Sequence, residues 1–216
     1  MQRHHRNEVV MAGALSLAAG FVDAVGFIHL GGYFVSFMSG NSTRAGAALA
    51  EGHPLGFLLA MGLVGAFTAG VISASILRRL VPSRKRMWVL LYVAAALGSA
   101  VVLYDLNLAV WLAPPVMALA MGAENVIFER DGEVSIGLTY MTGTLVKMGQ
   151  RMAAALAGED RLGWVRYLFL WLSLTMGSIV GGFAYFAFNL NALWVSVGIF
   201  VLAMAVNVRS RTPETV

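Results

Sequence analysis

Long apolar stretches separated by short polar turns dominate the chain. Each stretch is rich in Leu, Ala, Val and Gly and does not alternate in polarity, which is typical of membrane-crossing helices rather than barrel strands. One stretch carries the pair Pro114 and Pro115, which we expect to kink or break its helix. The pattern predicts an all-α integral membrane protein with spans at residues 9–30, 57–77, 87–104, 108–128, 164–188 and 192–208.

Two further stretches are too polar for an ordinary lipid-facing helix, and they resemble each other. They are FVSFMSGNSTRAG at residues 34–46 and IGLTYMTGTLVKMG at residues 136–149, called here the echo segments. An offset of 103 residues aligns Met38 with Met141, Ser39 with Thr142, Gly40 with Gly143, Arg44 with Lys147 and Gly46 with Gly149.

The similarity continues on both sides of the echo segments. An offset of 101 places Asp23 on Glu124, and an offset of 107 places residues 68–72 on residues 175–179. Internal duplication is the simplest interpretation. Chance similarity of glycine-rich helices is the alternative, and the matching of acid with acid and base with base counts against it. We predict a single transmembrane domain over residues 1–216, with repeat 1 at about 8–104 and repeat 2 at about 107–208.

The basic residues indicate how the repeats cross the membrane. If all eight helical segments crossed, a cytoplasmic N-terminus would put the cluster at residues 78–86 outside, against the positive-inside rule. If the echo segments are broken or re-entrant, then both termini, this cluster and the charged loop at Glu129 all lie in the cytoplasm. Each repeat then crosses the membrane three times. Because three is an odd number, the second repeat starts on the opposite side and is inverted relative to the first. We expect two inverted repeats, each of three transmembrane helices plus a broken or re-entrant helix; eight full spans in parallel repeats are the alternative.

Composition narrows the chemistry. Hydrophobic residues make up 59% of the 216 residues and charged residues 12%, with a mean hydropathy of +0.76. That is more apolar surface than one soluble core holds. The absence of cysteine excludes disulfides and thiol chemistry. The histidines lack metal-ligand spacing, so we expect no metal and no cofactor. The net charge of +4 lies largely in loops and tails, where it orients helices, so we expect no nucleic-acid partner.

Two carboxylates lie within the apolar region. An ionised carboxylate at membrane depth is costly unless it is paired, hydrated or protonated, so Asp23 and Glu124 need a specific environment. Arg44 and Lys147 occupy matching places, so each repeat offers one acid and one base that could meet across the glycine-containing break. Such a pair can be purely structural. Alternatively, the acid carries a proton during transport while the base neutralises an anion.

Small polar residues gather at the expected helix starts of the echo segments. Glycine lets the backbone turn or a ligand approach, hydroxyls cap free N–H groups, and the positive end of the helix dipole attracts anions. Close helix packing through small residues is the alternative. The candidate solute-binding residues are Ser39, Gly40, Asn41, Ser42, Thr43 and Arg44, with Thr142, Gly143, Thr144 and Lys147.

Two motifs resemble those of a known family. GFVDAVGFIHLGGYFVSFMSGNSTRAG at residues 20–46 and TYMTGTLVKMGQ at residues 139–150 are similar to the YoaK-type bacterial multi-span membrane proteins, a domain-of-unknown-function family. The resemblance covers nearly the whole chain. It implies a helical fold in the bacterial inner (plasma) membrane, and it supplies no substrate.

These observations favour a membrane transporter or channel for a small polar or anionic solute, bound between the echo segments at the membrane midplane. A non-transporting scaffold or sensor is the alternative. An intramembrane enzyme is less favoured, because only Asp23, His29 and Ser39 come near a catalytic grouping. The expected partners are the lipid bilayer and a small polar solute or ion. We also expect a homodimer, because additional helices would help to bury a polar pathway.

Overall fold

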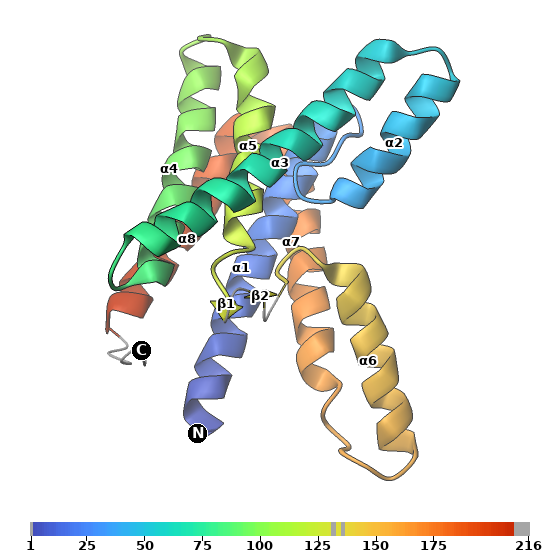
Figure 1. The fold of residues 1–216 in the computed structure, drawn as a ribbon, viewed down its shortest axis with the longest axis vertical. Helices are drawn as coiled ribbons and strands as arrows, with labels where there is room; N and C mark the ends of the chain where they lie inside the picture. The colour runs from blue at the N-terminus through green and yellow to red at the C-terminus, as the bar shows by residue number, and fades with distance from the viewer. Residues whose placement is uncertain (1, 131–132, 135–136, 210–216) are drawn as a thin grey trace.

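The computed structural model describes residues 2–130, 133–134 and 137–209 (Figure 1). Residues 131–132 of the predicted charged loop, the start of the second echo segment and Arg211 lie outside the described residues. The regular structure of the described residues is helical apart from one short antiparallel hairpin, β1 (Glu129–Arg130) with β2 (Glu133–Val134). The helices are α1 (Gln2–His29), α2 (Met38–Ala50), α3 (Pro54–Leu80), α4 (Lys85–Asp105), η1 (Val110–Leu112), α5 (Ala113–Glu124), α6 (Met141–Leu156), α7 (Val165–Phe188), η2 (Asn189–Ala192) and α8 (Leu193–Arg209).

Four stretches are long and apolar enough to cross a membrane. They are Glu8–His29, Pro54–Leu80, Lys85–Asp105 and Val165–Asn207. The last stretch contains two helices, α7 and most of α8, and the chain turns between them at η2. The predicted all-α membrane fold is confirmed at this level.

The sequence predicts a kink or a break at the proline pair, and the structure shows a break, since a helix begins there. Pro114 and Pro115 lie in the first turn of α5, so they begin this helix instead of bending a longer one. The first turn tolerates proline because the N–H groups there have no partner within the helix. The apolar helical stretch Val110–Glu124 is therefore shorter than the span predicted at residues 108–128.

The first long helix ends at a pair of adjacent glycines. Gly31 and Gly32 have φ angles of +64° and +110°, a backbone region that favours glycine. The Gly32 N–H donates to the Phe27 carbonyl at 2.8 Å, and the Gly31 N–H donates to the Ile28 carbonyl at 3.2 Å. These bonds satisfy carbonyls left free at the end of α1. The chain then runs without regular structure until α2 begins at Met38, so residues 34–37 of the first echo segment are loop and residues 38–46 are helix.

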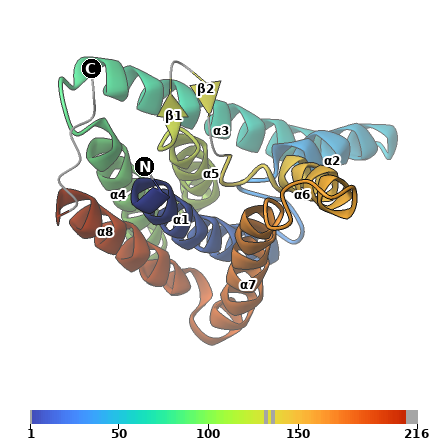
Figure 2. The ribbon, with the colours of Figure 1, turned by 90° about the horizontal axis from the view of Figure 1, so that it is seen from below.

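Two helices occupy the centre of the molecule. Figure 2 shows α1 and α5 surrounded by the other long helices. Helix α7 packs on α1, α3 packs on α5, and α4 packs on both α5 and α8. Helix α2 packs on α3 and α6 packs on α7, which forms two arms that diverge in Figure 1.

Two helix crossings bring backbone directly against backbone. A side chain at any of five glycines would run into a carbonyl of the opposite helix, so only glycine permits this approach. The α3–α5 crossing uses one glycine from each helix, whereas the α1–α7 crossing adds a second α7 glycine, Gly181, which faces Phe21. In the α1–α7 crossing Gly20 faces Leu174 and Gly177 faces Leu17, and in the α3–α5 crossing Gly122 faces Phe67 and Gly70 faces Leu119.

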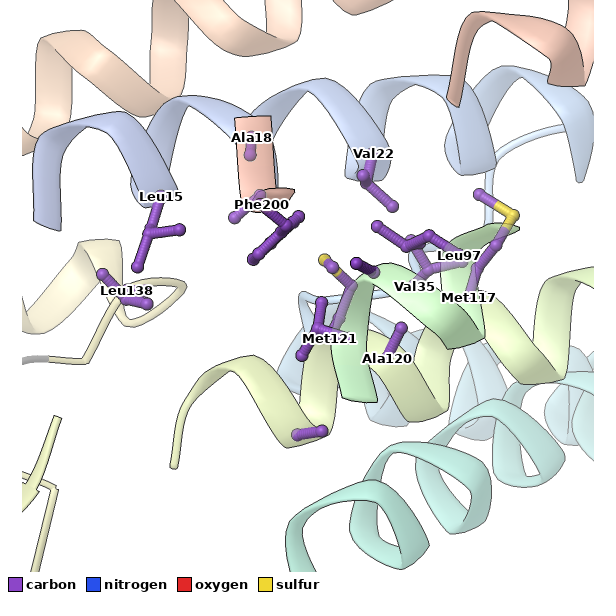
Figure 3. Close-up of a cluster of buried hydrophobic side chains, with 14 of the residues drawn as sticks. Leu15, Ala18, Val22, Val35, Leu97, Met117, Ala120, Met121, Leu138 and Phe200 are labelled. Carbon is purple, nitrogen blue, oxygen red and sulfur yellow. The ribbon is translucent and has the colours of Figure 1, made fainter. Parts of the chain in front are cut away.

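The loops before α2 and α6 are anchored in the core (Figure 3). Val35 lies beside Met117, and Leu138 lies beside Leu15. Both loop residues are fully buried. The starting points of α2 and α6 are therefore fixed against the central helices.

Replacing Gly70 by valine should destabilise the protein far more than replacing Gly65, although both glycines lie in α3. A side chain at Gly70 would meet the Leu119 carbonyl, whereas nothing lies within 4 Å of a side chain begun at Gly65. Overpacking costs about 1–3 kcal/mol, and a carbonyl yields less than a side chain does. The melting temperature in detergent should therefore fall in Gly70→Val and stay close to wild type in Gly65→Val. Equal melting temperatures would show that the crossing is not tight.

Candidate functional site

The two echo helices begin close to the middle of the molecule. The views in Figures 1 and 2 agree in placing the N-terminal ends of α2 and α6 near one another. From there α2 runs towards the upper end of Figure 1 and α6 towards the lower end. The two helices do not pack directly, since no Cα atom of one lies within 8 Å of a Cα atom of the other. The predicted solute-binding residues thus lie on two helices that start near a common region.

Asp23 holds the loop that leads into α2. The backbone N–H groups of Val35 and Ser36 donate to its Oδ1 atom at 2.9 and 2.7 Å. Two such bonds satisfy donors in an irregular segment, which would be costly to leave unpaired inside a membrane protein. Asp23 therefore positions the start of α2.

Arg44 reaches back from α2 to the turn that follows α1. Its guanidinium carbon lies 5.0 Å from the centre of the Tyr33 ring, a cation–π arrangement. Its side chain also fills the space beside Gly32, where a Cβ atom would lie 2.6 Å from one guanidinium nitrogen. The predicted Asp23–Arg44 ion pair is not formed, because each partner is engaged elsewhere in the same α1–α2 connection.

Asn41 is a structural clamp rather than a free ligand. Its side chain is fully buried. Its Oδ1 atom accepts from the Phe34 N–H at 2.9 Å, and its Nδ2 atom donates to the Phe34 carbonyl at 2.7 Å. Both ends of the amide are thereby occupied, and the loop is fastened to the first turn of α2. Sequence reasoning placed Asn41 in the binding site and missed this role.

The hydroxyl groups of the echo helices bond within their own helices. The hydroxyls of Ser42, Thr43 and Thr144 donate to the carbonyls four residues earlier, at 2.9, 3.1 and 3.2 Å. Neither α2 nor α6 has a side-chain hydrogen bond at its N-cap, so the predicted capping by hydroxyls is wrong. The first-turn N–H groups of both helices carry no side-chain cap.

Aromatic rings cover the first-turn glycines of both helices. A Cβ atom at Gly40 would collide with the Phe37 ring, and one at Gly143 would lie 2.6 Å from the Tyr140 ring. Phe37 and Tyr140 are the N-cap residues of α2 and α6. These glycines thus make room for the aromatic ring that precedes them, which sequence reasoning did not foresee.

The second half contains a buried carboxylate without a hydrogen-bond partner. Glu124, the last residue of α5, is fully buried, and neither of its oxygens has a partner among the described residues. Lys147 lies exposed on α6, so Glu124 and Lys147 do not form the predicted ion pair. The polar contact with the loop before α6 comes instead from Asn125, whose Oδ1 atom accepts from the Thr139 hydroxyl at 3.1 Å.

The contacts shift the predicted equivalence of the two acids by one residue. Gly20 and Gly122 occupy matching places in the two glycine crossings and are 102 positions apart. That spacing pairs Asp23 with Asn125, and both of these side chains bond to the loop before an echo helix. Glu124 therefore has no acidic counterpart at the matching position.

Most of the remaining candidate residues point away from the core. The exposed members are Ser39, Ser42, Thr43, Thr142 and Lys147. Thr144 is buried, and Arg44, Gly40 and Gly143 are partly exposed. The structure thus brings the two helix starts together but leaves much of their polar surface on the outside of a single chain.

Polar contacts at the two ends of the molecule were not predicted from the sequence. At one end Arg78 lies 3.6 Å from the Glu129 carboxylate, and Arg86 lies 3.6 Å from that of Glu8. At the other end the His29 Nδ1 atom lies 3.2 Å from the Tyr185 hydroxyl. These partners are far apart in sequence, and no local pattern points to them. Among the described residues, no group of three or more His, Cys, Asp or Glu side chains could hold a metal ion.

Comparisons with known proteins agree on one family. Residues 11–206 match the family described as "Protein of unknown function (DUF1275)". The chain is 33% identical over 191 residues to the UPF0700 transmembrane protein RA0705 of Rhizobium meliloti (strain 1021), covering 87% of this chain and 80% of that protein. It is 25% identical over 142 residues to the UPF0700 transmembrane protein YoaK of Bacillus subtilis (strain 168), covering 62% of each chain. No solved structure matches. The chain belongs to this DUF1275 family of membrane proteins, whose function is unknown, and the predicted YoaK-type resemblance is confirmed.

Proposed function

We propose that this protein is a transporter or channel for a small polar or anionic solute, bound between the N-terminal ends of α2 and α6. The observation that carries the proposal is that two polar helices begin near one another at mid-height and run to opposite ends (Figure 1). Uncapped helix N-termini present N–H groups and a positive dipole end, which favour anions. Broken helices that meet at the membrane midplane form the binding sites of many transporters.

Matching contacts in the two halves support an inverted repeat. In this repeat α1 corresponds to α5, α2 to α6 and α3 to α7. The α1–α7 crossing then corresponds to the α5–α3 crossing, and the packing of α2 on α3 corresponds to that of α6 on α7. The glycine contacts follow the same exchange, since Phe67 and Leu174, which meet Gly122 and Gly20, are 107 positions apart. In Figure 1 α1 runs upward and α5 downward. Two halves that run in opposite directions would be related by a pseudo-two-fold axis that lies in the membrane plane.

The distribution of charge supports an orientation. The N-terminus, the hairpin, the α6–α7 connection and the end of α8 lie in the lower half of Figure 1. The start of α4 is tied to the N-terminal part of α1, because Arg86 lies 3.6 Å from the Glu8 carboxylate. This end carries most of the basic residues, including Arg78, Arg84 and Arg86, whereas Arg44 lies on α2 in the upper half. Positive loops remain in the cytoplasm. The lower end would therefore face the cytoplasm of a bacterial inner membrane, with both chain termini on that side.

The candidate residues divide into two roles. Arg44 and Lys147 would supply positive charge along the path of the solute, one from each half. Glu124, buried and without a hydrogen-bond partner in the described part of the chain, would take up a proton, because a lone carboxylate in an apolar surrounding favours its neutral form. Asp23 and Asn41 would hold α2 in place.

Purified protein in liposomes tests the proposal with a panel of small inorganic and organic anions. Arg44→Ala and Lys147→Ala should each lower flux about tenfold, the loss expected when a hydrogen bond to a charged group is removed. Arg79→Ala is the matched control, because Arg79 is exposed at the end of α3 and should leave flux unchanged. Wild-type flux in both Arg44→Ala and Lys147→Ala would remove these residues from the pathway.

Asp23→Asn distinguishes a structural role from proton transfer at this residue. Asparagine keeps an oxygen that can accept from Val35 and Ser36, so a loop-holding role leaves both folding and flux near wild type. Loss of flux in a protein that still folds would instead assign proton transfer to Asp23.

A non-transporting scaffold or sensor is the second candidate. The observation that favours it is that Asp23, Asn41 and Arg44 are all engaged in contacts within the α1–α2 connection. Flux through wild-type liposomes no greater than through protein-free liposomes, across the whole panel, would favour this scaffold.

We also propose that a second copy of the chain covers the polar side of α2 and α6. Ser42 and Thr43 on α2, and Thr142 and Lys147 on α6, are exposed in a single chain. Polar groups facing lipid are unfavourable, so a partner that encloses them with water would complete the solute pathway. The site would then lie between two arms of one chain and those of its partner.

Cross-linking tests this homodimer directly, because the chain has no cysteine of its own. Ser42→Cys or Thr142→Cys should give a dimer with a short bis-maleimide in membranes. Ile72→Cys is the control, since Ile72 is 55% exposed on α3, away from this surface. The arrangement would be contradicted if Ile72→Cys gave dimer bands as strong as those of Ser42→Cys and Thr142→Cys. It would also be contradicted if neither Ser42→Cys nor Thr142→Cys gave a dimer band.

A further inference from the structure

A hollow outside the candidate site lies between the end of α6 and the start of α7. It has a volume of about 330 Å³ and is lined by Arg151, Asp160, Leu162, Gly163 and Arg166. The α6–α7 connection that forms it lies at the lower end of Figure 1, away from the starts of α2 and α6. Nothing in the proposed transport function uses it.

Gly163 keeps the hollow open. A Cβ atom at this position would lie 2.6 Å from the Asp160 Oδ2 atom and 3.6 Å from the Arg151 Cδ atom. The Asp160 carboxylate is held in the turn, because its Oδ1 atom accepts from the Leu162 N–H at 3.2 Å. The missing side chain thus leaves room between the aliphatic part of Arg151 and the turn.

The groups around the hollow favour an anion. Arg151 and Arg166 line it from the two helices, and neither forms an ion pair with a described acid. Arg161 adds a third positive charge in the same connection, against the two acids Glu159 and Asp160. Guanidinium groups match the oxygens of a phosphate geometrically, and they donate several hydrogen bonds at once.

The hollow lies at the end of a stretch that is long and apolar enough to cross a membrane. The apolar stretch that is long enough to cross a membrane begins at Val165, directly after Gly163 and Trp164. The Trp164 indole N–H donates to the Arg161 carbonyl at 3.0 Å, and the Arg166 guanidinium lies 4.6 Å from the centre of the Tyr167 ring. Tryptophan and tyrosine are enriched at the membrane–water interface. Basic pockets between helices at this level bind anionic lipid headgroups.

We propose that this hollow binds the phosphodiester headgroup of an anionic membrane lipid, with Arg151 and Arg166 holding its phosphate oxygens. The inference depends on the chain lying in a membrane and is independent of transport. A lipid held here would join the end of α6 to α7 and so brace the arm that carries the second echo helix. A soluble phosphate offers the same chemistry, and the position beside the first turn of an apolar helix favours the lipid.

Native mass spectrometry of the full chain in detergent, titrated with phosphatidylglycerol, tests the site. Replacing both Arg151 and Arg166 by glutamine should weaken binding roughly fivefold for each charge removed, the effect of one basic residue at an anionic surface. The double lysine variant should recover part of the affinity, because it retains the charge. Arg79→Gln is the control and should change binding less than about twofold, because Arg79 is exposed at the end of α3 and does not line the hollow.

A second probe identifies the source of the phosphate. Inorganic phosphate at millimolar concentration should not displace the lipid. If phosphate did displace lipid from the wild-type chain and failed to do so from the double glutamine variant, the hollow would be a site for soluble phosphate instead. Gly163→Val should reduce lipid binding by filling the hollow, with circular dichroism confirming that the helices remain. Wild-type affinity for phosphatidylglycerol in the well-folded double glutamine variant would overturn the proposal.

Discussion

Direct backbone contact at the two glycine crossings is the constraint on which the arrangement depends. Because Gly20 and Gly177 lack side chains, α1 and α7 approach until each glycine faces a carbonyl of the other helix. Gly70 and Gly122 do the same for α3 and α5. In a bilayer, helix association depends on such close packing, since lipid is as apolar as leucine. The crossings place α3 and α7, and with them the arms formed with α2 and α6.

The positions at which the arms begin depend on polar contacts inside the core. The loop before α2 has no regular hydrogen bonds of its own, and Asp23 and Asn41 together bind the backbone N–H groups of Phe34, Val35 and Ser36. The loop before α6 is held by Asn125 through Thr139, and by the Ser16 hydroxyl, which donates to the Leu138 carbonyl at 3.3 Å. Irregular backbone is tolerated at membrane depth only where protein or enclosed water satisfies it. The two half-helices can therefore start within the molecule.

Local chemistry made much of the fold predictable from the sequence. Adjacent glycines at 31 and 32 end α1, and Pro54 lies at the start of α3, because each residue restricts or frees the backbone at its own position. Long apolar runs located the crossing helices for the same local reason. The extent of α5 was not predictable by this route, since an unbroken apolar run hides the point where Pro114 begins a helix.

The candidate site was harder to predict, because the partners of its charged residues are set by three-dimensional packing. Sequence alignment found two polar helix starts that the structure places near one another. It also paired Asp23 with Arg44 and Glu124 with Lys147, although Asp23 bonds to a loop and Arg44 stacks on Tyr33. Glu124 has no hydrogen-bond partner among the residues that the structure describes. Nothing in the spacing of Asn41 and Phe34 distinguishes a backbone clamp from a solute ligand. Charge and spacing did not identify the contacts that these residues make.

The central claim is that the two halves enter the membrane in opposite directions, so that α2 and α6 end on opposite sides. Single cysteines at Glu51 and Glu159, just beyond these helices, can be tested in intact bacteria with a membrane-impermeant maleimide. The account predicts that Glu51→Cys is labelled from outside and that Glu159→Cys is labelled only after the membrane is permeabilised. Labelling of both positions from the same side would contradict it.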